Sequence, residues 1–309
     1  MKKRHLRSEL LFSLGFIFML IVTVAAFLYG VQVGYDRTES KYEAMKQLNS
    51  EADTGPSIAY QQQDLVSYYH TVFLPFREFQ NEWLTTMDKL RGESSADPVS
   101  ALKAAGKLAK QQQQTLAEAT LPPNTPLLEQ SRVSWLESLR LFGQVADLAA
   151  KQAGDAERGA ALTAVEKQAL YTEAVQQAVQ GQQRYYAAML KWGASVDPDL
   201  PDAFEMPSML PLADWSKQPL IVKNKIMADQ LANRGRLTSY YPQDLAAQTD
   251  QLIASGEAAN IKLTTVSAAV ELLVGTGAVR SGDFAASKSA FYVDELLPQL
   301  PFFFPSSAG

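Results

Sequence analysis

The chain has 309 residues, 47% of them hydrophobic and 20% charged, which is the composition of a folded protein. It has no cysteine and two histidines, which excludes disulfides, thiolate metal sites and a multi-histidine metal centre. The net charge is -5; residues 1–9 carry +3 (four basic residues and one Glu), so the remainder carries -8. Phosphate backbones repel such an acidic body. We therefore expect no metal, no cofactor and no nucleic-acid partner.

An uncharged apolar run, residues 10–35, follows the basic leader of residues 1–9. Its first twenty residues would span roughly 30 Å as a helix, the hydrocarbon thickness of a bilayer. Basic residues precede the run and the charges after it nearly cancel, so the positive-inside rule places the leader in the cytoplasm and the bulk outside. The sequence predicts a single-pass cell-membrane protein whose lipid-facing anchor includes Leu10, Phe16, Leu20, Val24 and Leu28.

The competing interpretation of this segment is a cleavable signal peptide. Val24, Ala25 and Ala26 provide small residues at the spacing required for cleavage after Ala26. The apolar run nevertheless continues to Tyr29, which makes it longer than a usual signal core. We favour an uncleaved anchor, followed by a polar stalk at residues 36–56.

Four apolar stripes at helical spacing occupy residues 57–195. The first is rich in aromatic residues and contains Pro75, where we expect a kink. Its members are Leu65, Tyr69, Val72, Phe76, Phe79, Trp83, Met87 and Leu90. The second helix should begin at Pro98 with Asp97 as its N-cap, and the third and fourth carry stripes at 128–149 and 162–190. Long helices with short connections predict an up-down four-helix bundle.

Residues 196–215 contain four prolines, which predicts an extended Pro-rich linker. Beyond it we expect a smaller C-terminal helical region, residues 216–309, with helices at about 217–232, 242–256, 260–275 and 282–297. No segment shows hairpin signals with sustained alternation, so the predicted fold class is all-α. The oily tail, residues 297–305, should dock on the body, since three phenylalanines exposed to water would promote association.

The sequence contains no phosphate-binding loop, nucleophile elbow, His-Glu-x-x-His or EF-hand pattern. We therefore predict no catalytic residue and no metal ligand. Asp197, Asp199 and Asp202 could offer oxygens to calcium, but they lack the glycine turn and bidentate glutamate of a calcium loop, which favours a solvated linker.

The first stripe holds more large rings than one narrow helix seam needs. Most should lie in the core, and a minority could rim a pocket or contact a partner. The candidates for this partner or pocket surface are Tyr68, Tyr69, His70, Phe76 and Trp83.

These features predict a non-enzymatic, membrane-anchored extracytoplasmic protein, an interaction or scaffold module of the cell envelope with a protein partner or self-association. The alternative is a ligand-sensing ectodomain, which would have to signal through a separate membrane protein, because about nine cytoplasmic residues cannot form an output domain. An envelope enzyme using paired carboxylates is a third hypothesis, although no spacing singles out a pair.

Overall fold

The computed structural model describes residues 60–92, 97–153 and 158–304, which all belong to one compact unit, Ile58–Gly309. The expected leader, anchor and stalk, including the five anchor residues, lie outside the described residues. Within the described ranges the secondary structure is helical, with no strand and one isolated bridge between Pro211 and Thr265. The all-α prediction is thus confirmed for this part of the chain. None of the helices described there is both long and apolar enough to cross a membrane.

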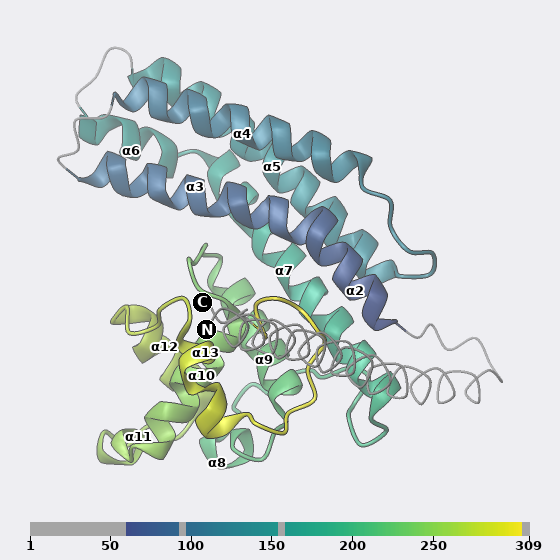
Figure 1. Ribbon diagram of the computed structural model, residues 1–309. Coiled ribbons are helices and arrows are strands. Elements are labelled where there is room, and N and C mark those ends of the chain that lie inside the picture. The colour runs from purple at the N-terminus through teal and green to yellow at the C-terminus, as the bar shows by residue number, and fades with distance from the viewer. Residues whose placement is uncertain (1–59, 93–96, 154–157, 305–309) are drawn as a thin grey trace, which may run out of the picture. The chain divides into compact units, whose positions relative to one another are not determined.

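The longest helices of the unit lie in its first half, residues 60–196 (Figure 1). The elements of this half are α2 (Gln62–Tyr68), the π-helical segment η1 (Tyr69–Phe73), α3 (Leu74–Arg91), α4 (Pro98–Glu118), α5 (Pro126–Ala153), α6 (Arg158–Glu166) and α7 (Ala169–Val196). Helix α5 packs against both α4 and α7, and α3 packs against α4 and α6.

The fourth predicted helix is wrong as a single element, because the chain breaks it into α6 and α7. Gln168 has an extended backbone at the break, and its side chain donates a hydrogen bond to the Ala164 carbonyl. This bond satisfies a carbonyl at the end of α6, a group that the interrupted helix leaves without a partner.

All eight members of the first stripe are buried. Pro75 does not break the helix, as predicted; it is the second residue of α3, directly after the π-helical turn η1. The Leu74 N–H bonds to the Tyr69 carbonyl, five residues back, across this turn. A π-turn is a recognised cause of helix bending.

Asp97 caps α4 as predicted, since its carboxylate accepts hydrogen bonds from the N–H groups of Val99 and Ser100. At the centre of this half, the Trp135 indole of α5 donates a 2.9 Å hydrogen bond to the Ala178 carbonyl of α7. Gly181 permits this approach, because a Cβ at that position would collide with the indole. Small residues thus set the distance between α5 and α7.

Short helices form the second half, residues 197–304, after a largely non-helical segment that runs to Pro211. They are α8 (Leu212–Trp215), α9 (Leu220–Arg234), α10 (Pro242–Ala254), α11 (Glu257–Asn260), α12 (Val266–Gly275) and α13 (Asp283–Phe291). Helix α9 is buried almost all round and packs against α7 and α10, while α10 contacts α12 and α13.

Two of the predicted C-terminal helices were too long. The helix expected from residue 260 begins at Val266, because Thr265 has an extended backbone and its hydroxyl caps the helix at Ala268. The helix expected to reach residue 297 ends at Phe291, because the backbone leaves the helix at Tyr292, whose side chain turns into the core.

Direct hydrogen bonds join the two halves. Arg77 and Gln80 of α3 donate to the loop before α10: Arg77 Nη2 lies 3.0 Å from the Ser239 carbonyl oxygen, and Gln80 Nε2 lies 2.8 Å from that of Thr238. The Tyr186 hydroxyl of α7 also donates to Gln243 Oε1, in the second half, at 2.6 Å. The C-terminal helices therefore share a continuous interior with α3 and α7.

Candidate functional site

Four of the five side chains expected at a partner or pocket surface lie in the core. Tyr68, Phe76 and Trp83 have at most 1% of their surface exposed and Tyr69 has 7%, whereas His70 is exposed. The rings pack on α5 and α7: Phe76 stacks on Trp135 at 5.0 Å between centroids, and Trp83 lies 4.6 Å from Phe142. The surface interpretation is corrected for these four residues, because aromatic side chains of α5 and α7, together with Phe302 near the C-terminus, cover these rings.

The acidic residues of the linker stay on the surface. The Asp199 N–H donates to the Asp197 carboxylate at 3.0 Å, and the Asp202 carboxylate lies 3.5 Å from Lys191 Nζ. Across the described ranges, no three potential metal ligands of the His, Cys, Asp or Glu type gather at one point.

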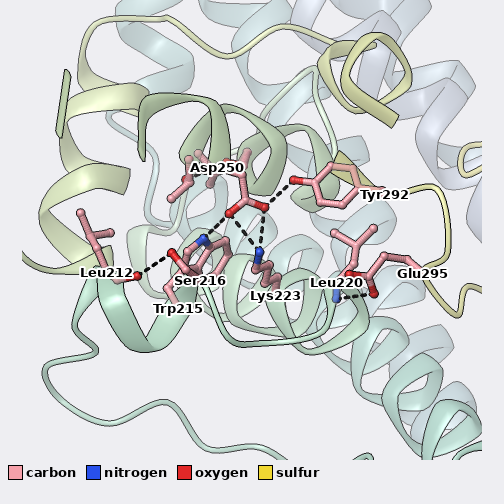
Figure 2. Close-up of polar contacts among 10 residues, drawn as sticks. Leu212, Trp215, Ser216, Leu220, Lys223, Asp250, Tyr292 and Glu295 are labelled. Carbon is pink, nitrogen blue, oxygen red and sulfur yellow. Dashed lines mark hydrogen bonds and ion pairs between the residues drawn. The ribbon is translucent and has the colours of Figure 1, made fainter. Parts of the chain in front are cut away.

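A buried polar cluster lies in the second half (Figure 2). We call it the Asp250 cluster; its members are Trp215, Lys223, Asp250 and Tyr292. Asp250 Oδ1 accepts hydrogen bonds from Trp215 Nε1 at 2.7 Å and from Lys223 Nζ at 3.0 Å. Its Oδ2 accepts from Lys223 Nζ at 2.9 Å and from the Tyr292 hydroxyl at 2.5 Å. The cluster joins α8, α9, α10 and the chain beyond α13.

Burial controls the chemistry of this cluster. All four side chains are buried, and desolvation together with the adjacent Asp250 carboxylate raises the pKa of Tyr292 far above its ordinary value. Tyr292 therefore remains a protonated donor. Both carboxylate oxygens already accept two hydrogen bonds each, so Asp250 has little capacity to act as a base toward an incoming substrate. Because its hydrogen bonds come from α8, α9, α10 and the chain beyond α13, the cluster holds these four segments together.

The cluster fixes the beginning of a C-terminal segment, residues Tyr292–Phe304, which we call the strap. Glu295 provides a second attachment, because its Oε2 accepts a 2.9 Å hydrogen bond from the Leu220 N–H at the start of α9 (Figure 2). A carboxylate at a helix N-terminus is favourable for both the free N–H group and the helix dipole.

The far end of the strap docks on an aromatic surface that both halves supply. We call this surface the strap face; it consists of Tyr69 and Phe73 from η1 and Tyr241 from the loop before α10. Phe302 lies 5.6, 5.5 and 5.3 Å from these three rings respectively, measured between centroids. The Arg77 guanidinium lies 4.3 Å from the Tyr241 ring centroid, a cation–π contact that holds that ring.

The next residues of the strap bind α13. Phe303 is buried against Phe284, and its carbonyl accepts a 2.8 Å hydrogen bond from Lys288 Nζ. The docking predicted for the oily tail is thus confirmed for Phe302 and Phe303, whereas Phe304 remains 38% exposed, with Lys288 Nζ 3.5 Å from its ring centroid.

An open groove lies on the outer surface of α4, α5 and α7. Its volume is about 670 Å³, and it is lined by Lys110, Gln113, Gln114, Ala117, Val133, Leu136, Glu137 and Gln177. The groove combines three amide side chains with three apolar side chains and one charge of each sign. It offers hydrogen-bond partners to a polar ligand, although it does not enclose one.

Sequence reasoning did not identify the Asp250 cluster, whose members are spread over residues 215–292. One local signal was available, because Lys223 interrupts the apolar start of α9, Leu220 to Val222. A lysine that continues an apolar run into the core needs a buried counter-ion.

Comparison of the chain with protein-family models, with curated proteins and with solved structures found no match.

Proposed function

We propose that this protein is a non-enzymatic interaction module, anchored in a membrane by residues 10–35 and presenting its helical unit outside the cytoplasm. The observation that carries the proposal is the uncharged run after a basic leader, followed by a compact helical unit that begins at Ile58. Long helices around α5 support a further detail, an up-down four-helix bundle of α3, α4, α5 and α7 as the presenting part.

The interior of the unit also supports a binding role over catalysis. Its buried charged side chains bind one another or backbone groups, as in the Asp250 cluster and at Arg77. Surfaces of helices and loops remain for contact with other molecules, and a tether limits those contacts to the membrane vicinity.

Membrane attachment is tested by placing a charge within the apolar run. Leu20→Lys should release the full-length chain into the soluble fraction, because a lysine at the centre of a membrane helix costs about 2.5–3.5 kcal/mol. Thr38→Lys, just beyond the run, is the matched control and should remain in the membrane fraction. Equal fractionation of the two variants would contradict the anchor.

Topology and partnership need a second measurement. A reporter that folds only outside the cytoplasm, fused after Gly309, should be active. Mild cross-linking followed by purification of the full chain should capture a reproducible partner or a second copy. A chain that stays solitary under several conditions would argue against an interaction module.

Ligand sensing through a separate membrane protein is a second candidate, favoured by the groove with Gln113, Gln114 and Gln177. A polar metabolite should then raise the melting temperature of the protein. Gln177→Leu should abolish that shift, whereas Gln144→Leu, a change at an exposed position of α5 outside the groove, should retain it.

A further inference from the structure

The chain exposes large apolar side chains at the C-terminal end of α13 and at the end of the strap. Phe291, the last residue of α13, is 42% exposed, and Val293 just beyond it is 73% exposed. Phe304 is 38% exposed. We call these three residues the apolar tip. Among the aromatic side chains of the described ranges, Phe291 and Phe304 are the only exposed ones.

Lys288 connects the two exposed phenylalanines. It lies one turn before Phe291 on α13, and its Nζ is 3.5 Å from the centroid of the Phe304 ring. The other exposed positions of α13 carry no charge; they are Ala285, Ala286, Ser289 and Ala290. The exposed surface of α4, by comparison, includes three lysines. The end of α13 is therefore both apolar and poor in charge, a combination that is unfavourable against water.

We propose that the apolar tip inserts into the surface of the bilayer that holds residues 10–35. Phe291, Val293 and Phe304 enter the boundary between headgroups and acyl chains, where apolar side chains leave water without needing a partner of complementary shape. Asp294, exposed beside Val293, remains among the headgroups and limits the depth of insertion. This inference rests on the proposed function, because the anchor supplies the bilayer.

The tether and the size of the tip favour a bilayer over a protein as the occupant. Residues 36–57 separate the apolar run from the compact unit and span at most roughly 75 Å when fully extended, which lets the unit turn this end toward the bilayer. The anchor keeps the unit beside the membrane, so a small contact suffices to hold it there. Three side chains are few for a specific protein interface, which buries about 800 Å² on each partner.

The net charge of the chain indicates that the contact is apolar and not electrostatic. Beyond residue 9 the chain carries -8, the total of -5 less the +3 of the leader. Anionic headgroups repel such a body. The tip should therefore enter neutral phosphatidylcholine at least as well as a membrane that contains phosphatidylglycerol.

The absence of cysteine from the sequence allows a direct test with the full-length chain in phosphatidylcholine nanodiscs. A nitroxide is attached to Ala290→Cys, an exposed position that leaves the tip intact, or to Ala104→Cys, an exposed position on α4 as the matched control. Electron paramagnetic resonance measures collisions of the nitroxide with oxygen, which concentrates in lipid, and with a nickel complex, which stays in water. The oxygen-to-nickel ratio should be several-fold higher at Ala290→Cys.

A charge at the tip should reverse this result. Val293→Glu, added to Ala290→Cys, should lower the ratio to that of Ala104→Cys, whereas Met209→Glu, at an equally exposed apolar position, should leave it high. Both are surface changes, and equal melting temperatures would show that the fold is retained.

Three results would overturn the proposal. One is an equal ratio at Ala290→Cys and Ala104→Cys. Another is a fall in the collisions with both oxygen and nickel at Ala290→Cys, which would show that a protein or a second copy covers the tip. The third is a high ratio that appears only when phosphatidylglycerol is present, which would replace the apolar contact with an electrostatic one.

Failure of this inference can be separated from failure of the proposed function. A chain that stays with the nanodiscs while the nitroxide on Ala290→Cys contacts water would retain its anchor and overturn only the insertion of the tip. A chain that does not associate with the nanodiscs would instead contradict the anchor itself.

Discussion

The two halves of the compact unit, residues 60–196 and 197–304, bury polar groups in different ways. In the first half, hydroxyl groups on α5 donate to carbonyls of α7, as Ser131 does to Gly181 and Ser138 to Ala174. In the second half, carboxylates enter the interior: Asp229, Asp244 and Asp250 are each at most 9% exposed, and no other Asp or Glu in the described ranges is as buried.

Helix length explains much of this difference. Every helix leaves free N–H groups at its start, so short helices present more of them per residue. Carboxylates satisfy several in the second half. Asp244 accepts hydrogen bonds from Tyr241 N–H at the start of α10 and from Phe284 N–H at the start of α13, and Glu295 accepts from Leu220 N–H at the start of α9. Long amphipathic helices can be held by apolar stripes, whereas short ones here depend on buried polar contacts.

The largest expected effect compares conservative changes in the two interiors. Asp250→Asn leaves Lys223 buried without a counter-ion and should lower the free energy of unfolding by about 3–5 kcal/mol. Leu139→Met, a volume-conserving change at a buried site of the first half, should cost under about 1.5 kcal/mol. Urea unfolding measures both. Adding Lys223→Met to Asp250→Asn should recover part of the lost stability. If the two single changes cost the same, the two interiors would not differ in their dependence on buried polar contacts.

A somewhat smaller effect tests the close approach of α5 and α7. Gly181→Ala places a methyl group against the Trp135 indole and should destabilise the protein by about 1–3 kcal/mol. Gly275→Ala, at the end of α12 with open space around it, should be neutral or stabilise by about 0.4–1 kcal/mol. Thermal unfolding distinguishes the two. A melting temperature unchanged by Gly181→Ala would show that the helices can separate without cost.

Two helix-capping carboxylates should respond to pH in opposite directions. Hydrogen bonds from the Ser100 side chain and backbone lower the pKa of exposed Asp97 below 3.8, so its contribution to stability is present above that pH and is lost as pH falls through the lowered pKa. Burial raises the pKa of Asp244 above 3.8, despite its backbone hydrogen bonds. Folding therefore favours protonated Asp244, and this contribution is present below pH 3.8 and is lost as pH rises through the raised pKa.

The measurement is the free energy of unfolding between pH 3 and 6, for the native chain and for Asp97→Asn and Asp244→Asn. The stability advantage of the native chain over Asp97→Asn should grow with pH. Its advantage over Asp244→Asn should shrink over the same range. If the free energies of unfolding of the two variants changed with pH in parallel, burial would not make Asp97 and Asp244 respond differently to pH.

The smallest effect concerns an ion pair on the surface. Lys110 Nζ lies 2.7 Å from the Asp147 carboxylate, and both side chains are about half exposed. Asp147→Ala should lower the free energy of unfolding by less than about 1 kcal/mol, and added salt should reduce this difference. If Asp147→Ala lowered the stability as much as Asp250→Asn does, burial would not explain why the two carboxylates contribute differently to stability.

Local sequence patterns predicted the first half better than the second. The eight residues of the first stripe, the Asp97 cap and the stripe of α5 all lie where their spacing indicated, because a helix places residues three or four apart on one face. The spacing of residues within one helix could not show how many sides of that helix other helices would cover. It therefore offered Tyr68, Phe76 and Trp83 as surface candidates, although α5 and α7 enclose them.

The sequence by itself determined the helical fold class, the approximate positions of the longer helices and the need of the oily tail for a docking site. It also indicated the uncharged run at residues 10–35, which remains a prediction of membrane attachment. Tertiary structure decided which polar residues are buried together and where the strap docks. Asp250 meets Trp215 and Tyr292 across 35 and 42 residues, and Phe302 meets Phe73 across still more. Such partners have no fixed spacing in the chain, because helix packing brings them together.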